Sequence, residues 1–127
     1  MILTDEKQAY YAHMLEHNRG FLIQHQGKLT LLVTYLLGDD DEKYLHHRVP
    51  WEIIDDDPSG TTMYIDQCIT DKQAYRTLLG ELDRVMRAVK HDYSQVQRAK
   101  WVRVGAQFRK HNTLEGATRH VYCKNIK

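Results

Sequence analysis

Apolar residues recur along the chain at two spacings, and both spacings occur in the stretch from Thr61 to Tyr93. Residues 61–70 alternate between apolar and polar, which predicts a β-strand. The face of this strand that is expected to be apolar carries Met63, Ile65 and Ile69. From Asp71 to Tyr93 the apolar residues recur three and four positions apart, which predicts the longest helix of the chain, with Asp71 as its N-terminal cap. Its apolar stripe consists of Tyr75, Leu78, Leu79, Leu82, Val85, Met86 and Val89.

A strand that passes through a short turn into a helix is a frequent ligand site in α/β proteins. The first amide N–H groups of such a helix have no partner inside it and point outward. We therefore expect any active site to lie near this turn.

The first third of the chain predicts a helix followed by a hairpin. Thr4 is a candidate cap, and the helix is expected to stop at residues 18–20, with Gly20 as the residue past its end. The apolar residues of this helix are Tyr10, Tyr11, Met14 and Leu15. The next two apolar runs, residues 21–23 and 29–37, predict two strands joined around Gln26-Gly27.

A long connection separates this hairpin from the strand at residues 61–70. It begins with an acidic run, is expected to form a short helical turn at residues 44–47, and ends in a turn at residues 55–60. Residues 49–54 are apolar again, so the connection is expected to touch the core. Residues 100–104 and 118–124 predict two final strands, joined by a loop at residues 109–116.

The predicted order is α-β-β-loop-β-α-β-β, which indicates one α/β (α+β mixed-sheet) domain over residues 1–127 with the long helix packed on the sheet. With 42% hydrophobic and 28% charged residues, the composition is that of a globular protein. The most apolar run, residues 29–37, is about half the length of a membrane-spanning helix. We expect a cytoplasmic protein in which Cys68 and Cys123 are reduced thiols.

The net charge of +1 conceals an asymmetry between the two parts of the chain. Residues 1–83 carry seven Lys/Arg and fifteen Asp/Glu, a balance of −8, whereas residues 84–127 carry eleven and two, a balance of +9. One interpretation is that the two parts neutralise each other in the fold. The other is that the basic part binds an anionic partner, which could be nucleic acid, an acidic carrier protein or a nucleotide-bearing cofactor.

Three short patterns carry weaker hypotheses. His13 and His17 stand in a His-x-x-Glu-His pattern whose histidines would share a helix face, as two zinc ligands do. The alternative is a pair of exposed helix histidines, and no third ligand is evident. The acidic runs at residues 39–42 and 55–57 lack the spacing of a calcium loop and are interpreted as solvated turns. Basic and aromatic residues around Trp101 could form a nucleic-acid platform, although Trp101 sits in an apolar strand that is typical of a core.

Asp66 is the most unusual residue of the central strand, because an acid among apolar neighbours is costly unless it is paired or has a chemical role. It is expected to pair with an arginine of the second half of the chain, or to orient a catalytic histidine. By strand alternation, Cys68 and Thr70 share its face. Together with Arg76 in the first turn of the following helix, they are the candidates for contact with a cofactor.

Scattered residues from about Asn18 onward resemble the toxin-activating lysine acyltransferases, which are small members of the GNAT (N-acetyltransferase) fold group. The matching positions are Gly20 to Ile23, Lys43 to Leu45, Pro58 to Gly60, Tyr64 to Asp66, Ile69, Arg98-Ala99 and Val102 to Val104. The resemblance implies a GNAT-like domain that transfers an acyl group to lysine, with acyl carrier protein or acetyl-CoA as the donor.

By the same resemblance, Asp66 takes the place of the family's acid, which acts together with a histidine. The family's histidine precedes its first helix and has no counterpart here, so His13, His17 or His25 would substitute. The glycine-rich loop of the acetyl-CoA branch is also absent from the start of the long helix. A second hypothesis follows, which is a non-enzymatic accessory or virion-associated protein of a bacteriophage that keeps the fold and binds a protein or nucleic acid.

Overall fold

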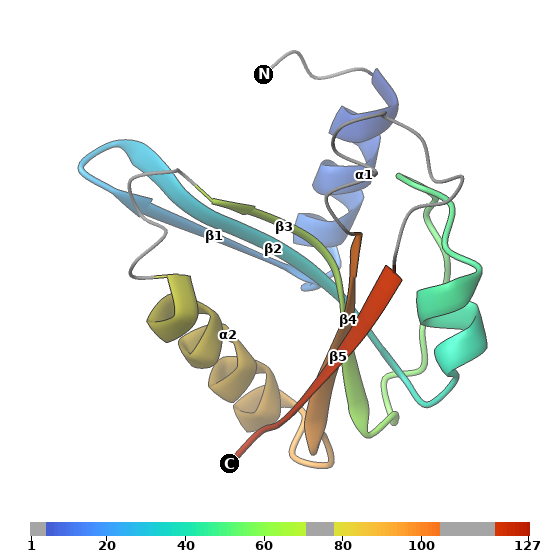
Figure 1. The fold of residues 1–127 in the computed structure, drawn as a ribbon. Helices are drawn as coiled ribbons and strands as arrows, with labels where there is room; N and C mark the ends of the chain where they lie inside the picture. The colour runs from blue at the N-terminus through green and yellow to red at the C-terminus, as the bar shows by residue number, and fades with distance from the viewer. Residues whose placement is uncertain (1–4, 71–77, 105–118) are drawn as a thin grey trace.

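The computed structural model describes residues 5–70, 78–104 and 119–127. Figure 1 shows its elements, which are α1 (Asp5–Glu16), β1 (Gly20–His25), β2 (Lys28–Gly38), η1 (Glu42–His46), β3 (Thr62–Thr70), α2 (Leu78–Asp92), β4 (Arg98–Val104) and β5 (Arg119–Asn125). The predicted order of helices and strands is confirmed, with η1 as a short π-helix in the long connection. The predicted cap at Asp71 and the loop at residues 109–116 lie outside the described residues.

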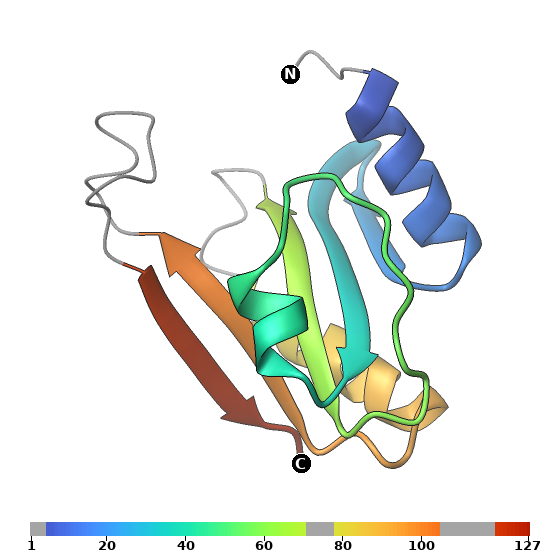
Figure 2. The same cartoon turned by 90° about the vertical axis from the view of Figure 1, so that its right-hand side faces the viewer.

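The five strands form one mixed sheet in the order β1-β2-β3-β4-β5. Neighbours pair antiparallel, except that β3 and β4 are parallel. The helix α2 covers one face of the sheet, and α1 and η1 cover the other (Figure 2). As predicted from its stripe, α2 packs Val85, Met86 and Val89 into the first of two cores. The second core joins Tyr10 and Met14 of α1 to the opposite face.

The parallel ladder between β3 and β4 is short. Its pairs are Thr62↔Arg98, Met63↔Ala99 and Tyr64↔Lys100. Beyond them the two strands diverge, as Figure 2 shows. We call the point where they part the splay. Among the described residues, the backbone of β3 from Ile65 and of β4 from Trp101 has no ladder partner across it.

A β-bulge places Asp66 outside the ladder between β2 and β3. Thr34 pairs with Gln67 and the next residue, Tyr35, pairs with Ile65, so Asp66 is the extra residue of β3. One extra residue reverses the faces beyond it. Ile69 consequently packs in the α1-side core and not on the face of Ile65, so the predicted alternation through residue 69 is wrong.

The end of α1 differs from its prediction in one residue. Asn18, not Gly20, adopts the left-handed conformation, with φ of 57°. The amide of Arg19 donates to the carbonyl of Met14 at 2.7 Å and that of Asn18 donates to Leu15 at 3.3 Å, which together form a Schellman motif. Gly20 instead begins β1. The predicted hairpin turn is confirmed, because Gln26 and Gly27 both have positive φ, of 53° and 77°.

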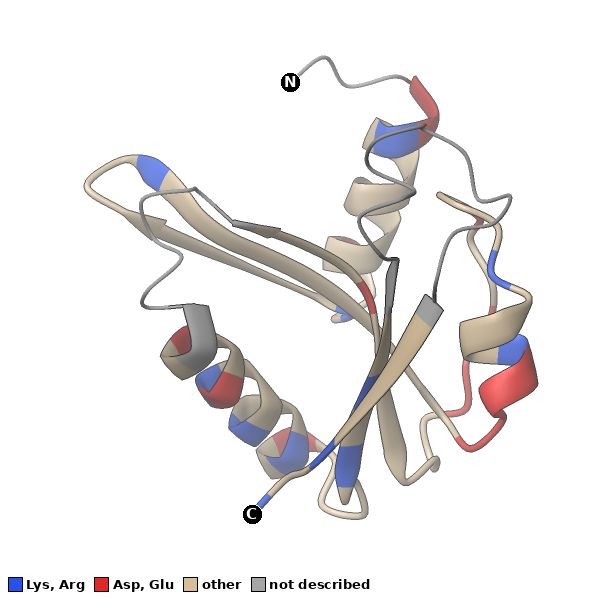
Figure 3. Cartoon of the chain, viewed as in Figure 1, with Lys and Arg blue, Asp and Glu red and all other residues tan. Residues whose placement is uncertain are grey.

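Internal ion pairs connect the acidic and basic parts of the chain. Lys100 lies 2.8 Å from Asp41, and Lys124 lies 3.5 Å from Asp83. Figure 3 shows acidic residues on η1 and its flanking connection, and basic residues along β4 and the end of β5. Part of the charge asymmetry is therefore neutralised within the fold.

The acidic runs act as turn caps. Asp39 accepts hydrogen bonds from the backbone and hydroxyl of Thr61, which hold the pKa of that carboxyl below its usual value. Asp57 accepts from Ser59 in the same way. Within the described ranges, no group of three or more metal-ligating side chains is present. No described helix is long and apolar enough to cross a membrane.

Candidate functional site

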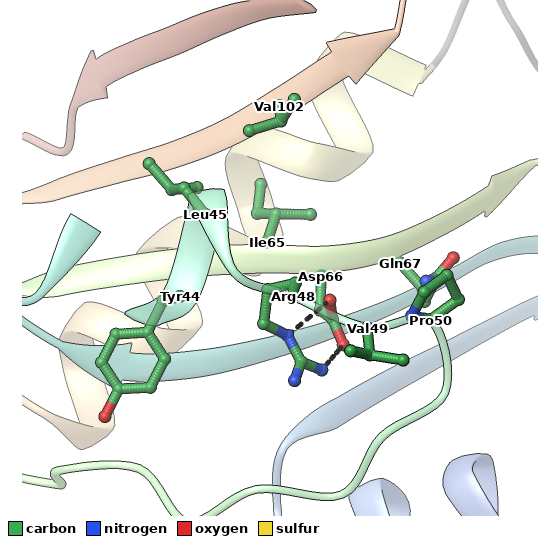
Figure 4. Close-up of a pocket in the computed structure, with 9 residues that line it drawn as sticks. All are labelled: Tyr44, Leu45, Arg48, Val49, Pro50, Ile65, Asp66, Gln67 and Val102. Atoms are coloured by element: carbon green, nitrogen blue, oxygen red, sulfur yellow. Dashed lines mark hydrogen bonds and ion pairs between the residues drawn. The ribbon is translucent and has the colours of Figure 1, made fainter. Parts of the chain in front are cut away.

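A pocket of about 150 Å³ lies at the splay, on the side of the sheet that η1 covers (Figure 4). Three segments far apart in sequence build it: η1 with the connection that follows, β3 at its bulge, and β4. The lining residues are Tyr44, Leu45, Arg48, Val49, Pro50, Ile65, Asp66, Gln67 and Val102. Its position at the junction of two diverging strands makes it the candidate functional site.

The pocket lining combines apolar and charged side chains. Leu45, Ile65 and Val102 lie near one another in Figure 4, and Arg48 lies beside them against Asp66. The Arg48 guanidinium approaches Asp66 through two nitrogens, with Nη2 at 2.7 Å and Nε at 3.3 Å from the carboxylate oxygens. Both side chains are about nine-tenths buried, at 11% and 10% exposed. A buried pair of this kind is neutral overall and rigid.

A directed chain of hydrogen bonds fixes Asp66 from the other side. The hydroxyl of Tyr10 donates to Asp66 at 2.5 Å, and because it has one hydrogen, Thr34 must donate to Tyr10 at 2.6 Å. The amide of Gln67 completes the chain by donating to Thr34 at 3.1 Å. Burial, the charge of Asp66 and its hydrogen bond all raise the pKa of Tyr10, so this phenol stays protonated.

These contacts limit what Asp66 can do chemically. Its carboxylate accepts from the Tyr10 hydroxyl and from two nitrogens of Arg48, which satisfies most of its lone pairs. A carboxylate with three acceptor positions already occupied has little capacity left to hydrogen-bond a substrate. The geometry therefore favours Asp66 as a residue that positions Arg48 and Tyr10.

Two buried polar atoms near this network have no hydrogen-bond partner among the residues that the structure describes, namely Nη1 of Arg48 and the hydroxyl of Tyr11. Nη1 is the arm of the guanidinium that points away from Asp66, because Nε and Nη2 face the carboxylate. Burial raises the pKa of Tyr11, and so does the charge of Asp66. Buried polar atoms without a partner are uncommon in folded proteins.

The predicted histidines lie away from this network. On α1, the rings of His13 and His17 stack with centroids 4.0 Å apart, and Nδ1 of His17 lies 2.8 Å from the carbonyl of His13. His17 is exposed, as is His25 at the end of β1. Within the part of the chain that the structure describes, Asp66 contacts Tyr10 and Arg48, and no histidine. A catalytic role for either α1 histidine stays a prediction.

The predicted ion pair of Asp66 exists, but its partner is different. The sequence favoured an arginine from the second half of the chain, and the structure provides Arg48 from the first. The reason is the connection after η1, which crosses back over the sheet and lays Arg48 against the bulge of β3.

Of the three predicted cofactor residues, Cys68 does not line the pocket. Cys68 is exposed, and its pairing with Val33 places it on the α2 face, opposite Asp66. The predicted face shared by Cys68 and Asp66 is wrong because of the bulge. Thr70 ends β3 and pairs with Leu31, while Arg76 lies outside the described residues. Their contact with a cofactor remains a prediction.

Sequence reasoning missed Arg48 and Tyr10. A signal for Arg48 was available, since it directly precedes the apolar residues 49–54 that were expected to touch the core. A basic residue beside one apolar stretch and an acid within another are natural partners. Tyr10 was placed in the apolar stripe of α1, which correctly predicts its burial but not the contact of its hydroxyl.

Comparison with known proteins identifies the fold. Neither a protein-family model nor a curated protein sequence matches the chain. Among solved structures, the chain is similar to the GphF GNAT-like decarboxylase in complex with isobutyryl-CoA, with a TM-score of 0.61 and 14% identity over 89% of this chain. It spans 60% of the length of that decarboxylase chain. It is also similar to an acetyltransferase, with a TM-score of 0.55 and 14% identity over 97% of this chain and 79% of the other. These likenesses, together with the mixed sheet and its splay, give the chain a GNAT-like α/β fold.

Proposed function

We propose that this protein binds an acyl thioester at the splay and transfers the acyl group to an amine. The observation that carries the proposal is the pocket, which spans β3 and β4 where their ladder ends and combines apolar side chains with the Arg48–Asp66 pair. Both structural neighbours support it, since one is in complex with isobutyryl-CoA and the other is named an acetyltransferase.

The splay offers groups that suit a thioester. Backbone N–H groups without a ladder partner can donate to the thioester carbonyl, and such donors stabilise the oxyanion that forms when an amine attacks it. In the proposed acyl transfer, the amine nitrogen bonds to the carbonyl carbon of the thioester and the carbon–sulfur bond breaks. The leaving thiolate gains the proton that the amine loses.

Within this step, Asp66 acts through Arg48 and Tyr10. The ion pair lines the pocket, and the hydroxyl of Tyr10 ties it to α1. We expect Asp66 to position Arg48 and Tyr10 and not to contact the amine directly. Whether His13 or His17 assists the amine is a separate hypothesis, which single substitutions of each by Ala would test by the rate of transfer.

The donor is proposed to be either a CoA thioester or an acyl carrier protein. Both present phosphate groups, and a carrier is acidic overall, so either suits the basic second part of the chain. The acceptor is proposed to be a lysine side chain.

The test is an assay of free thiol release with acetyl-CoA or acyl carrier protein as donor and a lysine-rich protein as acceptor. We expect release that depends on the acceptor, and its loss in Val102→Phe, which fills the pocket. Leu22→Phe, at an exposed position on β1, is the matched control and should retain it. Absence of both donor binding and transfer would contradict the proposal.

One observation favours a second candidate, a protein that uses the GNAT-like fold only to bind a partner. Asp66 already accepts three hydrogen bonds, from Tyr10 and Arg48, and contacts no histidine within the described ranges. A bacteriophage accessory protein would be one such case. Retained biological function in Asp66→Asn, with transfer absent in the wild type, would favour this candidate, and phage structural or anti-defence genes beside its own would support it.

A further inference from the structure

We infer that the open edge of β5 pairs with the same edge of a second copy of this chain, so that the two five-stranded sheets join into one continuous sheet. This inference concerns a surface outside the pocket and does not depend on the proposed acyl transfer.

β5 is the last strand of the sheet, and its outer side has no ladder partner among the described residues. Figure 2 shows it along one border of the sheet. Every residue from His120 to Asn125 is exposed. Two large apolar side chains lie in the middle of this strand, namely Val121 at 50% and Tyr122 at 40% exposed. An exposed edge with apolar side chains is a template for pairing with another chain.

β5 also lacks two of the features by which proteins protect an edge. Its ladder with β4 runs through seven residue pairs without a register shift, and it contains no proline. The opposite edge strand, β1, has a register shift between Ile23 and Gln24. Irregularities of that kind twist an edge away from pairing. Of the two edges, β5 is therefore the one suited to a second chain.

The backbone groups that face the open edge can be identified. The amide of Ile126 donates to the carbonyl of Gln97 at 2.9 Å, which continues the register of β4 and β5. In an antiparallel ladder, residues that bond to one neighbour alternate with residues that face away from it. Tyr122 consequently bonds to β4, whereas Val121 and Cys123 direct their N–H and C=O groups outward.

The sequence of β5 is nearly symmetric in chemical character about Tyr122. When two copies of a strand pair antiparallel about a two-fold axis, residues at equal distances before and after the axis lie opposite each other. An axis at Tyr122 aligns all seven residues and sets the outward-facing Val121 opposite Cys123, as a hydrogen-bonded pair requires. The apolar residues then meet in the middle and the polar residues at the ends. The pairs are Val121–Cys123, His120–Lys124 and Arg119–Asn125, each between the two copies.

The central pair extends an aromatic contact that already exists within each copy. The rings of Trp101 and Tyr122 stack with centroids 5.7 Å apart and an interplanar angle of 11°. Across the two-fold axis, Tyr122 takes a non-hydrogen-bonded position, where opposite side chains are closest. The two Tyr122 rings would then lie side by side between the two Trp101 rings, and cross-strand aromatic pairs of this kind stabilise a sheet.

The positive charge of β5 is the main obstacle to this pairing, because Lys124 of each copy approaches His120 of the other. Lys124 also lies 3.5 Å from Asp83 of its own α2, which compensates part of its charge. The same symmetry keeps this polar pair two residues away from the axis, so the apolar pairs occupy the centre of the contact. These features favour a second copy as the occupant of the edge.

The first experiment measures the mass of the purified chain by sedimentation equilibrium up to about 0.5 mM. We expect a reversible equilibrium between monomer and dimer. Val121→Pro should raise the dissociation constant at least tenfold, because each copy loses one outward N–H. Proline is tolerated on an edge strand where the N–H faces outward, so the monomer should fold. Val121→Thr, which keeps the N–H and the branched side chain, is the matched control and should change the constant less than about threefold.

The second experiment locates the axis by cross-linking under mild oxidation, with Cys68 and Cys123 replaced by Ser. Tyr122→Cys should form a disulfide-linked dimer, because only the residue on the axis meets its own counterpart. His120→Cys is the control, since its counterpart would lie four residues away along the strands, about 13 Å. It should cross-link at least tenfold more slowly.

A chain that stays monomeric throughout the concentration range would overturn the inference, and the edge would then be open to an extended segment of another protein. A dimer that a folded Val121→Pro leaves unchanged would do the same. Equal cross-linking of Tyr122→Cys and His120→Cys would rule out the axis at Tyr122, and this readout decides the matter even if Val121→Pro does not fold. None of these results bears on acyl transfer at the pocket.

Discussion

The Arg48–Asp66 pair shows how one buried contact can be essential to a site without adding much to stability. Removing two charges from water is costly, and their attraction roughly offsets this loss. Losing one partner is strongly destabilising, because the other charge then remains buried and unpaired. If Asp66 is the partner that is lost, Tyr10 also loses the charged acceptor of its hydroxyl.

Asp66→Asn should therefore lower the free energy of unfolding by about 3 kcal/mol, because it leaves the Arg48 charge without a counterion. The double variant Asp66→Asn/Arg48→Met should recover at least half of this loss. Urea unfolding of both variants measures the effect. Asp83→Asn is the control, since its pairs with Arg87 and Lys124 lie at the surface, and should cost less than about 1 kcal/mol. Equal losses in the single and double variants would contradict the interpretation.

The sequence identified Asp66 as unusual but not its partners, for a physical reason. The partners lie 56 residues away at Tyr10 and 18 residues away at Arg48. Periodicity indicates which face of an element is buried, but not which distant side chain meets it there. The isolated acid was visible in the sequence, whereas the contacts depend on how the connection after η1 folds over β3.

Among the elements, strands and helices were predicted well because their spacings are clear, and the errors lie at single inserted or unusual residues. The bulge at Asp66 is one such case, since an extra residue in a strand has no signature in an alternating pattern. Asn18 is another, because glycine is the more frequent left-handed residue at a helix end.

Two glycines of these elements should respond oppositely to alanine. Gly80 lies inside α2, and a methyl group there would meet nothing within 4 Å, so Gly80→Ala should raise the free energy of unfolding by about 0.5–1 kcal/mol. A methyl group on Gly60 would lie 2.3 Å from the backbone of Gly38, so Gly60→Ala should lower it by at least about 2 kcal/mol. Thermal and urea unfolding of both variants test this. A destabilising Gly80→Ala or a neutral Gly60→Ala would be inconsistent with the packing described.

For the molecule as a whole, three buried tyrosines make stability sensitive to alkaline pH. Burial is the largest cause of the raised pKa of Tyr10, Tyr35 and Tyr64, and for Tyr35 the value rises to about 12. Above pH 10 the unfolded chain releases these protons while the folded protein keeps them, so the free energy of unfolding falls.

Each buried tyrosine should contribute about 1.4 kcal/mol per pH unit to this fall. For Tyr35 the contribution should extend from about pH 10 to about pH 12. Urea unfolding at pH 9, 10 and 11 measures the slope, and Tyr35→Phe should reduce it by roughly this amount. Tyr122→Phe, at an exposed ring on β5, should leave the slope unchanged. A profile that stays flat to pH 11 would contradict the prediction.

For the whole molecule, the order of the helices and strands could be predicted from the sequence, but the arrangement of the strands in the sheet could not. The split of charge indicated that distant parts meet, and the Lys100–Asp41 pair is one such meeting. Which strands are neighbours depends on backbone pairing between segments that are far apart in sequence. The pattern of apolar and polar side chains carries no information about that pairing.

The short parallel ladder has a mechanical consequence for the whole sheet. The strands β1, β2 and β3 are joined by ladders of six and eight residue pairs, and β4 and β5 by one of seven. Among the described residues, three ladder pairs join these two parts, next to a hydrogen bond from the amide of Gln97 to the carbonyl of Thr61. Of the ladders in the sheet, rotating one part against the other would disturb only this short one, whereas sliding any strand within a part would break a longer ladder. The joint is therefore the least extensively paired place in the sheet, and the packing of Met63 against Ala99 in the α2-side core helps to hold the angle between the parts. Substitutions in that core are expected to change this angle more easily than the register of any strand.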